Sequence, residues 1–287
     1  MKKVKQLQQY PAGIKEFFRL YPQERNWDKF RNYTDYKNAL DETAYEELRK
    51  TLADVQHGLC VYCEADLIAE YKNYPPRIEH FCPKSFDKDD NVNWTLEIVN
   101  LFAACQGGTK KYYGSDNTDK SKFYYADKGN KSCDAVKNDK VPDLCVSKKL
   151  QNKYEVIKIL KPSDIPERPV IFKVTINGEH EGKLSENRKQ INDNEITDKA
   201  KNTIIELNLN CDRLVDARIA VIYKLKEASY SLDDNASDEQ IKQSQIELAK
   251  QFLFDKDGKP AEFFTTIRAF FKEIAEDILS KQPQSWI

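Results

Sequence analysis

Four cysteines lie at positions that could together bind one metal ion. Cys60 and Cys63 form a Cys-x-x-Cys pair, and Cys105 and Cys133 follow along the chain. A structural zinc site takes four ligands in a tetrahedral arrangement, so a single Cys-x-x-Cys pair needs two more. A redox Cys-x-x-Cys would need a thioredoxin-like βαβ context, which is not visible here. We therefore expect these four cysteines to hold a structural Zn²⁺. The alternative is that Cys105 and Cys133 are ordinary buried thiols.

The second half of this predicted zinc site is irregular. Cys105 is followed by Gln106-Gly107-Gly108, so glycine stands where a second Cys-x-x-Cys would have its other cysteine. Cys133 comes only after a long polar and aromatic stretch. Because the entropic cost of closing a loop grows slowly with its length, such an insertion is tolerable. The other three cysteines have no partners by spacing, and we interpret them as structural: Cys82, Cys145 and Cys211.

His80 is the histidine best placed for chemistry. It follows Glu79 in a short apolar strand between the two halves of the cysteine site, whereas His57 and His180 are expected at the surface. A neutral histidine near pH 7 can deprotonate water for phosphodiester hydrolysis. The reaction also needs a cation, and Mg²⁺ or Mn²⁺ prefers oxygen ligands such as Glu79 and Asp134. The alternative is that His80 is a satisfied core histidine.

Basic residues gather locally, although the formal net charge of the 287-residue chain is only −1. Between Cys105 and Lys161 there are thirteen lysines against seven acidic residues, with tyrosines and phenylalanines among them. Such a stretch suits phosphate contacts and base stacking, but it is equally typical of a solvated lysine-rich loop. We expect Lys84, Lys137 and Lys140, close to the predicted site in sequence, to contact nucleic acid.

The periodicity of apolar residues indicates an α+β protein in three regions. Residues 1–56 are predicted to be a helical arm whose aromatic side chains pack it onto the rest, with a Thr43–Glu46 capping box. Residues 57–145 contain strand-like runs at 77–81 and 101–104 and should carry the chemistry. Residues 146–287 are expected to form a β-hairpin, from runs at 154–160 and 170–176, and then helices. The first residues lack a signal peptide's apolar run and no stretch could span a membrane, so a cytoplasmic protein with reduced cysteines is expected.

Taken in order, these residues resemble the HNH endonuclease motif with its zinc knuckles. The motif runs through Cys60-x-x-Cys63, Ile78-Glu79-His80-Phe81-x-Pro83-Lys84, Asn100-Leu101-x-x-x-Cys105 and Cys133-Asp134-x-x-Lys137. The resemblance implies a ββα-metal core in which a β-hairpin and a helix clamp one catalytic metal ion. It implies that His80 is the general base, Glu79 a metal ligand, and Asn100 the residue that holds the loop or the base. Asp134 takes the third motif position, usually His or Asn, and would be the second metal ligand.

The likeness extends to PtuB, the HNH subunit of Septu-type anti-phage systems, some of them associated with retrons. It rests on residues 56–64, the Ala104–Gly108 run, the Lys137–Lys140 tail and residues 203–210. It implies a DNA-cleaving effector and an ATPase partner of the SMC/ABC class, PtuA. Two alternatives remain open: an RNA-cleaving toxin of the same fold, and a non-catalytic, zinc-stabilised module that binds nucleic acid or a partner.

Overall fold

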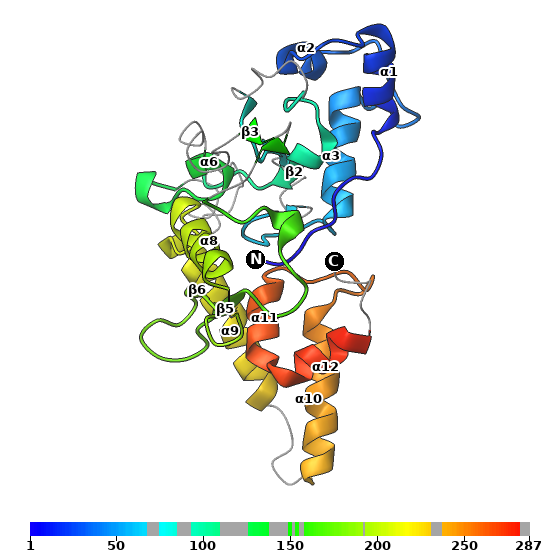
Figure 1. The fold of residues 1–287 in the computed structure, drawn as a ribbon. Coiled ribbons are helices and arrows are strands. Elements are labelled where there is room, and N and C mark those ends of the chain that lie inside the picture. The colour runs from blue at the N-terminus through cyan, green and yellow to red at the C-terminus, as the bar shows by residue number, and fades with distance from the viewer. Residues whose placement is uncertain are drawn as a thin grey trace.

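Short strands and helices surround the motif residues in a computed structural model of the chain. It describes residues 1–67, 75–84, 93–109, 126–137, 149–150, 153–154, 158–191, 193–230 and 237–281. In Figure 1 the N-terminal helices lie at the top, the motif region in the middle and the C-terminal helices below. The predicted α+β class is confirmed, since helices and small antiparallel sheets are both present.

The N-terminal arm consists of α1 (Ala12–Leu20), α2 (Trp27–Arg31) and α3 (Ala44–Val55). The predicted capping box is present, because Thr43 Oγ1 accepts from the backbone of Glu46 while the Glu46 carboxylate accepts from the backbone of Thr43. Aromatic rings pack the arm together, with Phe17 and Phe30 centroids 5.3 Å apart.

The motif residues lie on a two-stranded antiparallel sheet followed by a helix. Strand β1 (Arg77–His80) pairs with β2 (Leu101–Ala104), with His80 opposite Leu101 and Arg77 opposite Ala104. Helix α6 (Asp134–Lys137) follows, so the order is ββα as expected of an HNH core. Alternation along β1 places Arg77 and Glu79 on one face and His80 on the other.

Helices make up most of the described C-terminal region. Its described elements are β3 (Lys149–Leu150), β4 (Lys153–Tyr154), β5 (Phe172–Val174), β6 (Leu184–Glu186), α8 (Asn194–Glu206), α9 (Asp212–Tyr230), α10 (Asp238–Leu253), α11 (Phe264–Phe271) and α12 (Glu273–Lys281). The run at 170–176 contains β5, which pairs with β6 and with no described residue of the run at 154–160. The expected long strand at 154–160 is wrong at its described end, since residues 158–160 are coil.

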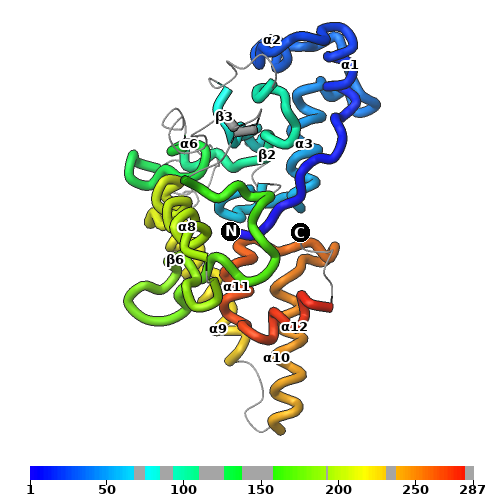
Figure 2. Tube along the Cα trace, in the orientation of Figure 1, coloured from blue at the N-terminus to red at the C-terminus, as the bar shows by residue number. Residues whose placement is uncertain are grey.

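A continuous apolar core joins all three sequence regions, from Met1 through the motif strands to Phe263. The N-terminal segment passes beside α3 and reaches α11 (Figure 2), where the amino group of Met1 lies 3.1 Å from Glu64 Oε1 and 2.9 Å from Thr265 Oγ1. Glu64 follows directly on Cys63, so these contacts tie the first cysteine pair to the C-terminal helices. No described helix is long and apolar enough to cross a membrane.

Candidate metal centre and active site

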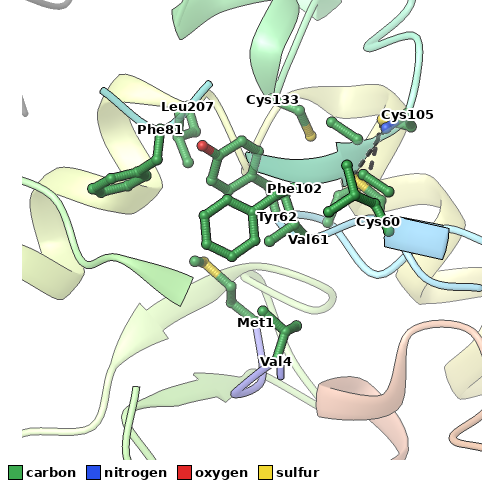
Figure 3. Close-up of a cluster of buried hydrophobic side chains, with 14 of the residues drawn as sticks. Met1, Val4, Cys60, Val61, Tyr62, Phe81, Phe102, Cys105, Cys133 and Leu207 are labelled. Carbon is green, nitrogen blue, oxygen red and sulfur yellow. Dashed lines mark hydrogen bonds between the residues drawn. The ribbon is translucent and has the colours of Figure 1, made fainter. Parts of the chain in front are cut away.

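The four predicted cysteine ligands come together in one buried cluster. The sulfur atoms of Cys60, Cys63, Cys105 and Cys133 all lie within 4.8 Å of one another. Cys60 and Cys63 flank a tight turn, Cys105 follows β2, and Cys133 precedes α6. Figure 3 shows three of these side chains beside the apolar rings of Tyr62 and Phe102, with the Cys105 amide donating to Cys60 Sγ at 3.3 Å. Four thiols this close suit a single tetrahedral ion.

The Gly107-Gly108 pair explains how Cys133 joins the cluster after a long insertion. Gly107 has φ +59°, and a Cβ there would lie 2.3 Å from the carbonyl oxygen of Ser132. Its own carbonyl accepts from the Ser132 amide at 3.1 Å. The glycine therefore lets the chain leaving β2 run directly against the chain entering α6. Gly107, next to the position where a second Cys-x-x-Cys would have its cysteine, thus allows the close approach that brings the displaced fourth ligand into position.

The electrostatics of the cluster fit a divalent ion. Contact with Cys105 raises the pKa of Cys63 well above its ordinary value, and burial does the same for Cys133, so the four thiols cannot all ionise without a cation among them. A divalent ion with four thiolates would be a dianion. Two buried arginines of α9 face it. Burial acts to lower the pKa of Arg213, but the negative charges of the Cys105 and Cys63 thiolates act the other way, and the net result is a raised pKa. Arg218 binds the carbonyls of Gly182 and Leu209, with guanidinium nitrogens at 3.1 and 2.7 Å.

Two ion pairs join β1 to α6. Arg77 lies 3.1 Å from Asp134, and Lys137 Nζ lies 2.5 Å from Glu79 Oε1. The Tyr62 hydroxyl donates to the same Glu79 oxygen at 2.7 Å, and Lys137 also donates to the carbonyl of His80 at 2.8 Å. Glu79 and Lys137 are each only 3% exposed. Lys137 is therefore an internal counter-ion in this conformation, and its ammonium is not at the surface where a phosphate contact was expected.

The carboxyl groups of Glu79 and Asp134 fit a shared divalent ion. Burial raises the pKa of Glu79 to about 8, opposed by the charge of Lys137 and reinforced by Asp134. Burial also acts to raise the pKa of Asp134, but its hydrogen bond with Glu79 and the charge of Arg77 lower it. Glu79 thus favours its protonated form and Asp134 its charged form. Carboxylate oxygens are the donors that Mg²⁺ or Mn²⁺ prefers, and an added divalent cation would favour the charged form of both groups.

His80 is neutral and oriented by its surroundings. Its Nε2 lies 2.9 Å from the carbonyl oxygen of Thr95, which can only accept, so Nε2 carries the hydrogen. Nδ1 makes no hydrogen bond with any described residue and is left as the basic nitrogen. The Trp27 ring packs edge-on against the imidazole at a centroid distance of 4.4 Å. Burial lowers the pKa of His80 to about 3, opposed by Thr95 and assisted by the charges of Lys84 and Lys137.

Asn100 closes the loop between the two strands. Its Oδ1 accepts from the Cys82 amide at 2.6 Å, and its Nδ2 donates to the carbonyls of Cys82 and Trp94 at 2.9 and 2.7 Å. All of these partners are backbone groups of the segments that flank His80. Asn100 therefore acts on the position of His80 and does not itself touch a reacting group.

The remaining predicted residues lie in varied settings. Lys84 is exposed, with its ammonium 5.6 Å from the Trp27 ring centroid, while Lys140 and most of the lysine-rich stretch lie outside the described residues. Cys82 and Cys211 are buried free thiols, and Cys145 is outside the described residues. Three site neighbours were missed from the sequence: Arg77, Tyr62 and Trp27. Arg77 had a usable signal, since it stands two residues before Glu79 on the same strand face.

Replacing Lys137 with methionine is expected to destabilise the protein by about 3–5 kcal/mol, because Glu79 would keep a buried charge without its partner. The Glu79 pKa is already raised above the value of an unfolded chain, so folding favours its protonated form. The loss should therefore be small near pH 5 and grow as the pH rises toward 8. Urea unfolding at both pH values measures it.

The double variant Lys137→Met with Glu79→Gln removes both charges and serves as the matched control. It should recover much of the stability that Lys137→Met loses at pH 8. Equal losses for the single and double variants would show that Glu79 and Lys137 are not energetically coupled.

Comparison with known proteins gives one informative relative. No protein-family profile matches the chain. A protein of Escherichia coli, named "Retron Ec83 putative HNH endonuclease", is 33% identical to it over 211 residues. The match covers 69% of this chain and 70% of that protein. The similarity therefore extends far beyond the cysteine and histidine motifs.

Proposed function

Because the chain belongs to the HNH endonuclease family, we propose that it hydrolyses phosphodiester bonds of DNA with a divalent metal ion. The observation that carries the proposal is the meeting of Glu79 and Asp134, from β1 and α6, next along the chain to a neutral His80 whose Nδ1 is its basic nitrogen. This set combines a metal-binding carboxylate pair with a general base. We further infer that the cysteine cluster holds Zn²⁺ and that Glu79 and Asp134 bind Mg²⁺ or Mn²⁺.

In the proposed reaction, His80 Nδ1 takes a proton from a water molecule as that water attacks phosphorus. The Thr95 carbonyl holds the tautomer that makes this possible. Glu79 and Asp134 would hold the divalent ion, whose charge would stabilise the phosphate and the leaving oxygen. Lys137 donates hydrogen bonds to both the Glu79 carboxylate and the His80 carbonyl, which fixes their relative positions. Asn100 fixes the backbone at Cys82, two residues after His80. Arg77 orients Asp134 in the same way.

The biological setting that we propose is bacterial anti-phage defence. The relative's name places that protein with a retron, and the sequence motifs resemble PtuB of Septu-type systems. On this basis the chain would be the nuclease effector of a complex with an SMC/ABC-type ATPase resembling PtuA. The partner and the cytoplasmic location stay predictions.

Incubating the protein with supercoiled plasmid and, in parallel, with total RNA tests the proposal. We expect nicking or cutting of the plasmid with Mg²⁺ or Mn²⁺, alone or with the ATPase partner. Activity should be lost in the Glu79→Gln variant, which keeps the size of the side chain but cannot supply a carboxylate. Cleavage of RNA alone would reassign the substrate. Equal plasmid cleavage by Glu79→Gln would overturn the assignment of the metal site.

A further inference from the structure

The segment that carries the fourth cysteine, residues 129–133, lies against the corner where α8 turns into α9. This α8–α9 corner, residues 207–213, belongs to the C-terminal region, and its Asn208 stands 77 residues after Lys131 of the segment. In Figure 1 the two meet where α6 lies beside α8. The segment also runs against Gly107, whose carbonyl accepts from the Ser132 amide. Cys133 is therefore held both from the end of β2 and from the α8–α9 corner.

The end of α8 makes the first contact with the cysteine. Asn208 has φ +48°, the left-handed conformation in which an asparagine can end a helix. The last carbonyl groups of a helix have no donor within the helix. The carbonyl of Leu207 accepts from the Cys133 amide at 2.9 Å. The helix end thus fixes the peptide plane that leads into the ligand.

Two side chains of the α8–α9 corner hold the backbone just before the cysteine. The Asn208 amide donates to the carbonyls of Gly129 and Lys131 at 2.7 and 2.9 Å. Arg213 donates through Nε to the carbonyl of Asn130 at 3.3 Å, and its backbone amide donates to Asn130 Oδ1 at 3.3 Å. Three consecutive carbonyl groups of the segment therefore accept hydrogen bonds from the corner.

Ser132 links Arg213 to the metal ligand itself. The serine is fully buried, and its hydroxyl oxygen accepts from Arg213 at 2.5 Å while it lies 3.5 Å from Cys133 Sγ. An arginine can only donate, and a metal-bound thiolate can only accept. The hydroxyl hydrogen of Ser132 is therefore directed to the sulfur when the cluster holds its ion.

Cys133 needs this support because its backbone conformation is unfavourable. Its φ is +58°, in the left-handed region that residues other than glycine and asparagine adopt only at a cost. Such a conformation persists only where the surrounding structure imposes it. Asp134, the proposed ligand of the catalytic ion, follows directly as the first residue of α6. The same backbone turn therefore sets where that helix begins.

We propose that the α8–α9 corner is a positioning part of the metal centre, in which Asn208 and Arg213 hold Cys133 in place to bind the ion. The inference rests on the metal assignment within the proposed function, since it concerns the ion of the cysteine cluster and not the cleavage step. Groups that orient a metal ligand commonly change metal affinity about 10–100-fold. The C-terminal region is then needed for a complete metal centre, because the contacts that hold the fourth ligand come from residues 207–213.

Zinc release from the full chain, purified with its metal, to a chromogenic chelator tests this proposal. Asn208→Gly keeps the left-handed backbone accessible but removes the amide, and it should release zinc at least about tenfold faster. Ser132→Ala removes only the hydroxyl between Arg213 and the sulfur, and it should accelerate release to a smaller extent. Asn210→Ala is the matched control, because Asn210 also makes two hydrogen bonds to backbone, at 2.8 and 2.9 Å, but to Leu184 of β6. It should release zinc at the parental rate.

Cobalt-substituted protein distinguishes positioning of the ligand from a general loss of stability. The sulfur-to-cobalt charge-transfer band gains intensity with each bound thiolate, so a Cys133 that leaves the ion should lower it by about a quarter. We expect this fall in Asn208→Gly and the parental spectrum in Asn210→Ala. Circular dichroism checks that each variant is folded, and Ser132→Ala, the milder change, decides the test if Asn208→Gly does not fold.

The outcomes separate this inference from the proposed function. If the parent holds zinc and both Asn208→Gly and Ser132→Ala keep its release rate and cobalt spectrum, the corner does not position the ligand and the inference is wrong. If plasmid and RNA stay uncut but both variants release zinc faster, the inference stands and the proposed activity fails. A parent protein without metal in the cysteine cluster would overturn the inference together with the zinc assignment, whatever the digestion experiment shows.

Discussion

Replacing Cys60 with alanine is expected to abolish metal binding at the cysteine cluster and to unfold much of the protein. The cluster connects the turn after α3, the end of β2 and the start of α6, so it ties the segment after the N-terminal arm to β2 and α6 of the ββα unit. Apparent zinc-binding energies in small zinc modules reach about 10–16 kcal/mol, more than the whole stability of an ordinary domain. We expect a large fall in Tm, with less than one bound zinc per chain by elemental analysis.

Cys82→Ala is the matched control for this prediction. Cys82 is also a buried free thiol, but it lies outside the cluster, and burial raises its pKa to about 11, which keeps it neutral. Its loss removes packing only, at a cost of about 1–2 kcal/mol, and should leave the metal content unchanged. A chelator added to the parent protein should reproduce the Cys60→Ala result. Full stability and unchanged zinc content in Cys60→Ala would contradict a four-cysteine metal centre.

Local patterns in the sequence were enough to predict the parts of the site that lie on one short segment. The run at 101–104 became β2, whose four apolar residues are all buried. The run at 77–81 contains β1, which pairs with β2 although its buried side chains are Glu79 and His80. The Cys-x-x-Cys spacing predicted the first half of the cluster, since two thiols two residues apart in a tight turn can reach one ion. Cys133 was proposed because a Cys-x-x-Cys pair leaves a zinc site incomplete, although nothing in its own neighbourhood relates it to Cys60.

Contacts between distant segments could not be predicted in the same way. Lys137 was expected to meet phosphate because a lysine near a site is usually exposed, yet it pairs with Glu79, 58 residues earlier in the chain. Only the packing angle of α6 on β1 decides which side chains of that helix face inward. Trp27 was predicted to pack the arm onto the rest of the protein, and it does. That its partner is His80 depends on how the arm lies against the end of β1.

Replacing His80 with alanine is expected to lower the cleavage rate by about 10²–10⁴-fold, the usual contribution of a general base. The fold should survive, because His80 lies at the end of β1 and its ring makes one described hydrogen bond, to Thr95, while its backbone contacts are kept in alanine. His180→Ala serves as the control, since His180 is an exposed residue of a loop and should keep parental activity. Initial rates on plasmid and Tm values for the three proteins make the comparison.

The pH dependence of the parent enzyme distinguishes the role of His80 from that of Glu79. Burial lowers the pKa of His80 to about 3, so its neutral, basic form is present across pH 5–9 and should produce no fall in activity below pH 6.5. Glu79 is different: its pKa is raised to about 8, and a proton on it competes with the metal ion. At subsaturating Mn²⁺, activity should therefore rise with pH up to about 8, and saturating Mn²⁺ should shift that rise to lower pH. In His80→Ala the residual activity should keep the same metal-dependent rise, because Glu79 is unchanged. A rise centred near pH 6.5 that disappears in His80→Ala would instead mean that His80 is exposed to solvent in the active enzyme and titrates as an ordinary histidine.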